Sequence, residues 1–248
     1  KAVSGPARPA SGTQFDFTLA ADSTTANAPM PATGGEKVTI TDDGKVNYSG
    51  TDQFGTITYT EAGTYKYTVT ETGTSANGWT NDKNLTRSIE VKVTENNGTL
   101  SAAVTVDGTT GTTSSFTNTY AVTPVKLELP VSKALTGATP STSETFTFTI
   151  SAASGTPPLP TSTSTTISGA GNGKFGEIEF TSAGSYQYTV AETKGSNPSY
   201  TYDGTSHTIT VTVTDNNGAL SAAWSDSTDS TATAIKFSNK YTKPVDVT

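Results

Sequence analysis

The stretch YTVTET at residues 67–72 decides the fold, and a second copy, YTVAET, stands at residues 188–193. Aromatic and β-branched residues recur at every second position in both copies, which is typical of a strand that packs one face into a core. Each strand carries a glutamate, Glu71 or Glu192, in phase with its tyrosine and valine. Buried carboxyl groups are rare and costly, so we expect each glutamate to have a specific role.

The rest of the chain also falls into two copies around these strands. FGTITY from Phe54 matches FGEIEF from Phe175, and each phenylalanine precedes its glutamate by 17 positions. ENNG at residues 95–98 and DNNG at residues 215–218 lie between alternating runs, and their Asn-Gly steps predict tight hairpin turns. Such duplication indicates a tandem repeat.

The repeat predicts two domains, residues 1–123 and 124–248. Each copy holds about seven or eight short strand-like runs, separated by Gly, Asn, Asp and Pro clusters. We therefore predict an all-β chain of two tandem immunoglobulin-like antiparallel β-sandwiches. Residues 121–132 are expected to form an extended connector that becomes the first strand of the second domain. The tail at residues 242–248 resembles the start of that connector, so we expect a segment cut from a longer array.

Composition excludes several classes of function. A net charge of −7 and a pI near 4.7 argue against nucleic acid or an anionic membrane as a partner, since both require a basic face. The chain has no cysteine, which excludes disulfides and thiolate metal sites. It carries no signal peptide, transmembrane run or LPxTG sorting signal, so we expect an excised or processed segment that does not itself insert into a membrane.

Three polar residues of each copy lie in apolar strands near the ends of the repeat. They are Lys1, Glu71 and Asn118 in the first copy and Lys133, Glu192 and Asn239 in the second, with the asparagine 47 positions after the glutamate in both. First and last strands of a sandwich commonly pair or face each other, so we expect each set to converge in a core. The alternative is an ordinary buried Lys–Glu salt bridge, with the asparagine as a strand-end turn residue.

Four motifs together identify a family resemblance. A lysine precedes an aliphatic-x-Gly step, and F-x-F, Y-x-Y-x-V-x-E and terminal F-x-N-x-Y strands follow in both copies. The chain thus resembles the isopeptide-forming repeats of Gram-positive backbone pilins and surface adhesins, which are related to Cna protein B-type domains. Gln14 stands where the family has a strand-start glutamate, which we assign to Glu144 in the second copy.

The resemblance implies one Lys–Asn isopeptide bond per domain, with Glu71 and Glu192 as catalytic proton shuttles. Burial lowers the pKa of a lysine toward the neutral amine that can attack an amide. Burial also favours a protonated glutamate, which we expect to donate to the asparagine carbonyl oxygen and polarise it. Attack and loss of ammonia would leave an amide in a single turnover without cofactor or metal, so we do not expect an enzyme.

The resemblance further implies a secreted stalk segment of a pilin or adhesin, anchored to the bacterial cell wall, whose partners are neighbouring repeats of the same polypeptide. The alternative is a host-binding adhesin region in which surface loops at residues 21–35 or 153–168 contact a host surface molecule. Their Ser, Thr and Pro content favours a spacer instead. A true enzyme has the least support, because no unpaired catalytic set remains once the triads are assigned.

The remaining candidate residues are given structural interpretations. His207 has no cysteine or second histidine beside it and is expected to be solvated. The DDG sequence at residues 42–44 lacks the further acidic positions of a calcium loop and predicts a turn. Glu177 and Glu179 share a strand face, but the first copy has threonines there, so we expect them to face solvent. The two tryptophans are interpreted as strand or loop packing.

Overall fold

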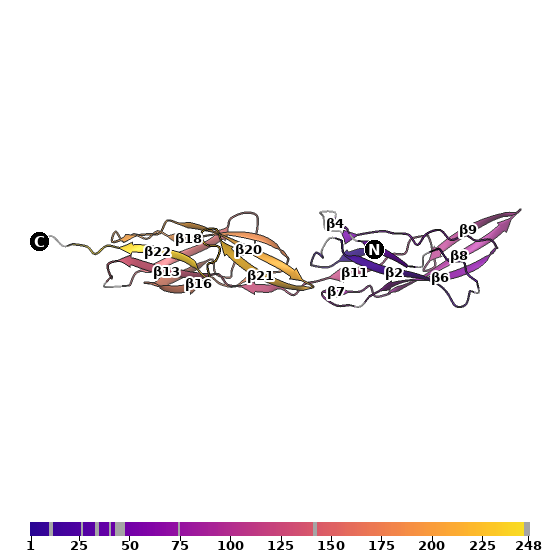
Figure 1. The fold of residues 1–248 in the computed structure, drawn as a ribbon, viewed down its shortest axis with the longest axis horizontal. Helices are drawn as coiled ribbons and strands as arrows, with labels where there is room; N and C mark the ends of the chain where they lie inside the picture. Colours follow the sequence, from indigo (N-terminus) through magenta and orange to yellow (C-terminus); the bar gives the residue numbers. More distant parts are fainter. Residues whose placement is uncertain are drawn as a thin grey trace. The chain divides into compact units, whose positions relative to one another are not determined.

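The structure is a computed structural model that describes residues 1–9, 12–25, 27–32, 35–39, 41–42, 48–73, 75–140 and 143–245. The chain divides into two compact units, Lys1–Ala121 (unit 1) and Val122–Thr248 (unit 2), two residues before the expected boundary. All secondary-structure elements in the described residues are strands, as predicted (Figure 1). None of the described segments forms an apolar helix of membrane-spanning length.

Unit 1 consists of two sheets that enclose one core. The first has the order β4 (Thr41–Asp42), β5 (Tyr48–Ser49), β1 (Ala2–Ser4), β11 (Thr117–Tyr120), β7 (Trp79–Thr80). The second has the order β10 (Thr109–Thr110), β9 (Thr99–Val106), β8 (Thr86–Asn96), β6 (Gly63–Thr72), β2 (Gln14–Ala21), β3 (Gly35–Thr39). Phe17, Tyr67 and Val91 pack together with Phe116 between the sheets. This is the predicted sandwich.

Unit 2 repeats the arrangement with one additional ribbon. Its first sheet has the order β16 (Gly171–Lys174), β13 (Pro130–Gly137), β22 (Ile235–Tyr241), β19 (Tyr200–Thr201). Its second has the order β15 (Ser164–Ser168), β14 (Thr145–Ala152), β18 (Gly184–Thr193), β20 (Ser206–Asn216), β21 (Ala219–Asp226), and β12 (Val125–Leu127) pairs with β17 (Ile178–Phe180). Phe148, Tyr188, Ile209 and Phe237 fill the core.

The first and last strands of each unit are parallel neighbours, β1 with β11 and β13 with β22, and Figure 1 shows the second pair side by side. All other strand pairs of the described residues are antiparallel. Leu135 lies opposite Asn239, and Val3 lies opposite Asn118. Since side chains alternate along a strand, this register brings Lys133 and Asn239 to the same face of the first sheet.

A glycine lies at the end of the first strand in each of these parallel pairs. A Cβ atom on Gly5 would lie 2.3 Å from the carbonyl oxygen of Tyr120, and one on Gly137 would lie 2.4 Å from that of Tyr241. Both glycines also have positive φ angles, 118° and 86°. The aliphatic-x-Gly step after each lysine therefore allows the first strand to lie directly beside the end of the last strand.

Two local predictions have different outcomes. The Asn-Gly hairpins are confirmed, because Asn97 and Asn217 have φ angles of 54° at the turns between long paired strands. The prediction of a surface loop at residues 153–168 is wrong for residues 164–168, which form β15 and pair with β14. Ile167 points into the core, 5% exposed, and the surrounding Ser and Thr residues hide this alternation in the sequence.

Candidate functional site

The three predicted residues of unit 2 meet in its core. Lys133 comes from β13, Glu192 from β18 on the facing sheet, and Asn239 from β22. The Nζ of Lys133 donates to Oε2 of Glu192 at 2.6 Å, and the Nδ2 of Asn239 donates to Oε1 at 2.6 Å. The side chains of Lys133 and Glu192 have no exposed surface, and Asn239 is fully buried. One carboxyl group thus bridges an amine and a carboxamide.

Unit 1 brings its three residues together in the same way. Lys1 donates through Nζ to both oxygens of Glu71, at 2.7 Å to Oε1 and 2.9 Å to Oε2. The Nδ2 of Asn118 donates to Oε1 at 2.7 Å. The side chains of Lys1 and Glu71 are 0% and 2% exposed. Both sets that the sequence predicted therefore converge without access to solvent.

Strand alternation explains why these polar groups are buried. On β6, Tyr67 and Val69 are 1% and 3% exposed, and Glu71, next in phase with them, is 3% exposed. On β22, Phe237 is 1% exposed and Asn239, two positions later, is 0% exposed. A strand cannot turn one of these residues to solvent without turning its apolar neighbours as well. The fold thus forces the polar side chains into contact.

An aromatic ring lies beside each lysine amine. The Nζ of Lys133 lies 4.8 Å from the centre of the Phe146 ring, and that of Lys1 lies 4.5 Å from the Phe15 ring. Loss of hydration on burial lowers the pKa of both lysines below the usual value, against the opposing effect of the hydrogen bond and charge of the paired glutamate. Each site therefore favours a neutral amine more than water does.

The asparagine oxygen has a partner that the sequence did not reveal. Oδ1 of Asn239 accepts the main-chain N–H of Asp203 at 2.7 Å, and Oδ1 of Asn118 accepts that of Asp82 at 2.8 Å. A main-chain N–H can only donate, so it faces the oxygen and leaves the amide nitrogen to the glutamate. The expectation that the glutamate donates to the carbonyl oxygen is therefore wrong: a main-chain N–H polarises that oxygen.

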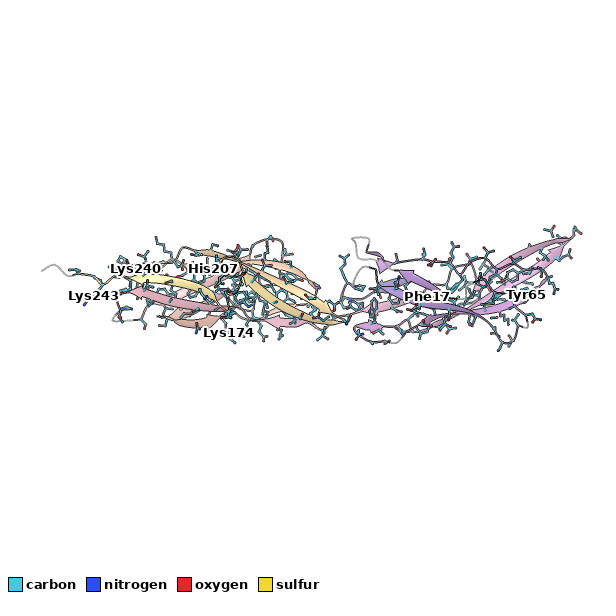
Figure 2. All side chains as sticks on the ribbon, in the orientation of Figure 1. Phe17, Tyr65, Lys174, His207, Lys240 and Lys243 are labelled. Carbon is cyan, nitrogen blue, oxygen red and sulfur yellow. The ribbon has the colours of Figure 1, made fainter. Side chains whose placement is uncertain are left out.

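The prediction that His207 is solvated is also wrong. His207, labelled in Figure 2, is 4% exposed. Its Nδ1 lies 2.6 Å from Oδ2 of Asp226, and its ring centre lies 4.7 Å from that of Phe237 in the core of unit 2. Its counterpart in unit 1 is Arg87, which lies over Phe116. His207 is in phase with Ile209 on β20, a signal that the sequence did contain.

Other candidates occupy structural positions. Glu177 and Glu179 are exposed, and Glu177 pairs with Lys126 at 2.9 Å. Trp79 packs against Tyr120, with ring centres 4.6 Å apart. Residues 43 and 44, where the sequence predicts a turn, lie outside the described residues. Within the described residues no group of three His, Cys, Asp or Glu side chains is placed to hold a metal ion.

The strand register also corrects one family assignment. Phe17 lies opposite Glu71 and Phe148 lies opposite Glu192, so the two phenylalanines are counterparts. Counting back from them, Thr13 rather than Gln14 corresponds to Glu144.

A family model described as "Spy0128-like isopeptide containing domain" matches residues 1–121 and 129–242. No curated protein matches the chain. Among solved structures, the major pilin from Streptococcus pyogenes is 21% identical, with 97% of this chain and 96% of that chain covered and a TM-score of 0.40. The major pilin protein (T-13) from Streptococcus pyogenes is 18% identical, with 97% and 96% covered and a TM-score of 0.37.

Proposed function

The chain belongs to the family of Spy0128-like isopeptide containing domains, and on this premise we propose that each unit forms one intramolecular isopeptide bond. The bonds join Lys1 to Asn118 and Lys133 to Asn239. The observation that carries the proposal is the contact, repeated in both units, of one buried carboxyl with an amine and a carboxamide.

A simple salt bridge accounts for less of this arrangement. Burial of two opposite charges commonly costs more free energy than their attraction returns, so a buried pair is poor support for stability. The pair alone also gives no reason for a carboxamide that is held at both polar atoms. A reaction that converts the charged amine into a neutral amide removes most of the free-energy cost of burying the charges, and it uses all three groups.

The steps can be written for unit 2. The Lys133 ammonium passes one proton to Glu192, and the resulting amine attacks Cγ of Asn239 with its lone pair. The carbonyl π electrons move to Oδ1, where the N–H of Asp203 stabilises the negative charge. Fixed positions of the reacting groups supply most of the rate, with effective molarities on the order of 10⁵ M or more.

Proton transfers complete the exchange. The carboxyl returns a proton to Nδ2 of Asn239, and the attacking nitrogen gives its second proton to the carboxylate. The Cγ–Nδ2 bond then breaks, its electrons leave with ammonia, and the C=O bond reforms. Lysine has lost two protons: one departs in ammonia and one remains on Glu192 until solvent removes it. The carboxyl thus acts as a proton shuttle that works once.

The bond would join the first strand of each unit to the last. It closes a loop of about 100 residues, which contributes roughly 4–5 kcal/mol to stability in the chain-entropy model. Because the two strands are parallel neighbours, a pull on the two ends of a unit would pass through the covalent bond and not through the residues between. Unfolding under load would then be blocked kinetically.

This mechanical property suits a structural part. We assign the chain to the stalk of a pilin or adhesin, secreted and anchored to the cell wall of a Gram-positive bacterium through other segments. The second candidate, host binding through the loops, has one observation in its favour. Met30 and Leu159 are 40% and 48% exposed, one in each loop region. Single exposed apolar residues are common on protein surfaces, so the stalk remains the better supported function.

Peptide mapping tests the proposal. Trypsin requires a free lysine amine, so a linked Lys133 should resist cleavage, and tandem mass spectrometry should find a branched peptide that carries Lys133 and Asn239. An exposed lysine of the same unit, Lys174, serves as the cleavage control (Figure 2). Complete cleavage after Lys133 with an unmodified Asn239 peptide would refute the bond in unit 2.

A further inference from the structure

We propose that Asp82 and Asp203 are positioning residues for isopeptide formation, which hold their own main-chain N–H against the oxygen of the reacting asparagine. This inference rests on the proposed function and adds to it the carboxylate that positions the N–H donor. Both aspartates follow the glutamate of their unit by 11 positions and precede its asparagine by 36 positions.

In unit 2 the Asp203 carboxylate ties its loop to the reacting strand. Oδ2 accepts the N–H of Ser238 at 2.8 Å, and Oδ1 accepts the N–H of Thr205 at 2.9 Å. Ser238 directly precedes Asn239 on β22, and the N–H of Asp203 returns to Oδ1 of Asn239 at 2.7 Å. Asp203 therefore makes one contact with Ser238 and one with Asn239. Together these contacts fix the N–H donor relative to the carboxamide.

Unit 1 contains the same pair of contacts. The Asp82 carboxylate accepts the N–H of Thr117 at 2.7 Å and that of Asn84 at 3.0 Å, and its own N–H donates to Asn118 at 2.8 Å. Arg87 also donates to Oδ2 of Asp82 at 3.0 Å. Two units with different surrounding residues thus keep one arrangement around the asparagine.

The contacts indicate a geometric role, because the direct effect of the Asp203 charge on the lysine opposes the reaction. Burial raises the pKa of Asp203, but hydrogen bonds from Thr205 and Ser238 outweigh it and hold the pKa below its usual value. The resulting negative charge raises the pKa of Lys133, which opposes formation of the neutral amine. The carboxylate therefore favours the reaction only because it positions the main-chain N–H of Asp203.

The test follows the bond in unit 2 after cell-free synthesis. Samples are quenched in acid at intervals, and digestion with mass spectrometry gives the linked fraction of the Lys133 and Asn239 peptides. We expect Asp203→Ala to slow the bond about 10- to 100-fold, because a misplaced oxyanion donor loses most of its effect. Asp203→Asn keeps one acceptor oxygen and should give an intermediate rate. Asp229→Ala is the matched control, since Asp229 also accepts a nearby N–H, from Thr231 at 3.1 Å.

The unit 1 bond of the same molecules reports that synthesis and folding proceed normally, and circular dichroism checks the fold of the purified variants. Asp82→Ala repeats the test in unit 1. Wild-type rates in both Asp203 variants would overturn the inference, as would a faster bond in Asp203→Asn, which would indicate an effect of charge on Lys133. Absence of any bond in the wild-type chain would instead refute the proposed function.

Discussion

Each unit has a triad of lysine, glutamate and asparagine, but the two glutamate oxygens accept hydrogen bonds from different partners in the two units. In unit 2, Oε2 of Glu192 accepts from Lys133 and Oε1 accepts from Asn239, so each oxygen serves one nitrogen. In unit 1, Lys1 reaches both oxygens of Glu71, and Oε1 also accepts from Asn118. A carboxyl with one oxygen on each nitrogen is arranged to accept a proton on one side and return it on the other. Unit 2 is therefore closer to the geometry that the proposed reaction needs.

The residue beside the triad also differs. Unit 1 has Arg87, whose Nη2 lies 3.0 Å from the Asp82 carboxylate and which stacks on Phe116. Unit 2 has His207 at the same place, which packs edge-on against the Phe237 ring but pairs with Asp226. The two units therefore share the aspartate N–H contact to the asparagine, whereas the aromatic ring packs against an arginine in one unit and a histidine in the other.

The largest effect is expected from the glutamates. Glu192→Ala should abolish the bond of unit 2 and leave that of unit 1 intact, and Glu71→Ala should do the reverse, because proton transfer by a positioned carboxyl is worth about 10² to 10⁴ in rate. Peptide mapping of both variants checks this. Glu177→Ala, which changes an exposed glutamate, should leave both bonds intact. A normal bond in the unit that lost its glutamate would show that the carboxyl is not the shuttle.

A second effect concerns stability. Glu192→Gln and Glu71→Gln preserve the shape of the side chain, and each should lower the free energy of unfolding of its own unit by about 4–5 kcal/mol through loss of the cross-link. The two decreases should be equal within error, because loop entropy depends only weakly on loop length. Hydrogen exchange in urea measures each unit separately. Clearly unequal decreases would mean that a contribution other than loop closure also changes, and changes differently in the two units.

A third effect depends on pH and separates linked from unlinked chains. In Asn239→Ala, Lys133 stays a free buried amine whose pKa burial lowers, against the opposing effect of Glu192. The unfolded chain then binds more protons between the lowered pKa and the usual value of 10.5, so the stability of unit 2 should rise with pH across that window. If the wild type carries the proposed bond, it has no such amine and should lack this rise. Urea unfolding at a series of pH values gives the slope, and a fall with pH in the variant would contradict the assigned shift.

The smallest effects are expected beside the triads. Arg87→Ala should slow the unit 1 bond by about 3-fold, because a partly exposed ion pair is worth less than 1 kcal/mol. His207→Ala should leave the unit 2 rate near wild type but destabilise that unit by about 1–3 kcal/mol, since buried Asp226 loses a partner. Rate measurements and thermal unfolding distinguish the two outcomes. A slow unit 2 bond in His207→Ala would place the histidine in the reaction.

The sequence predicted the parts of the site that repeat along strands. Glu71 and Glu192 stand in phase with buried tyrosines and valines, and the equal spacing to the asparagines reveals the partner strand. The sequence alone could not give the parallel direction of the first and last strands, because adjacency in a sandwich does not fix direction.

The missed features depend on main-chain groups and hidden alternation. Asp82 and Asp203 act through an N–H in irregular segments, where no side-chain pattern marks a buried donor. Their equal distance from the glutamates was visible in the two copies but had no meaning without the fold. His207 was expected to be solvated because no cysteine or second histidine lies beside it, although its phase with Ile209 predicts burial.

Intact mass spectrometry of the purified chain tests the central claim most directly. Each isopeptide bond releases one ammonia, so the denatured chain should be lighter than its sequence mass by two ammonias. Glu71→Ala and Glu192→Ala should each regain one, after correction for the substitution. A wild-type chain at its full sequence mass would contradict the account in both units.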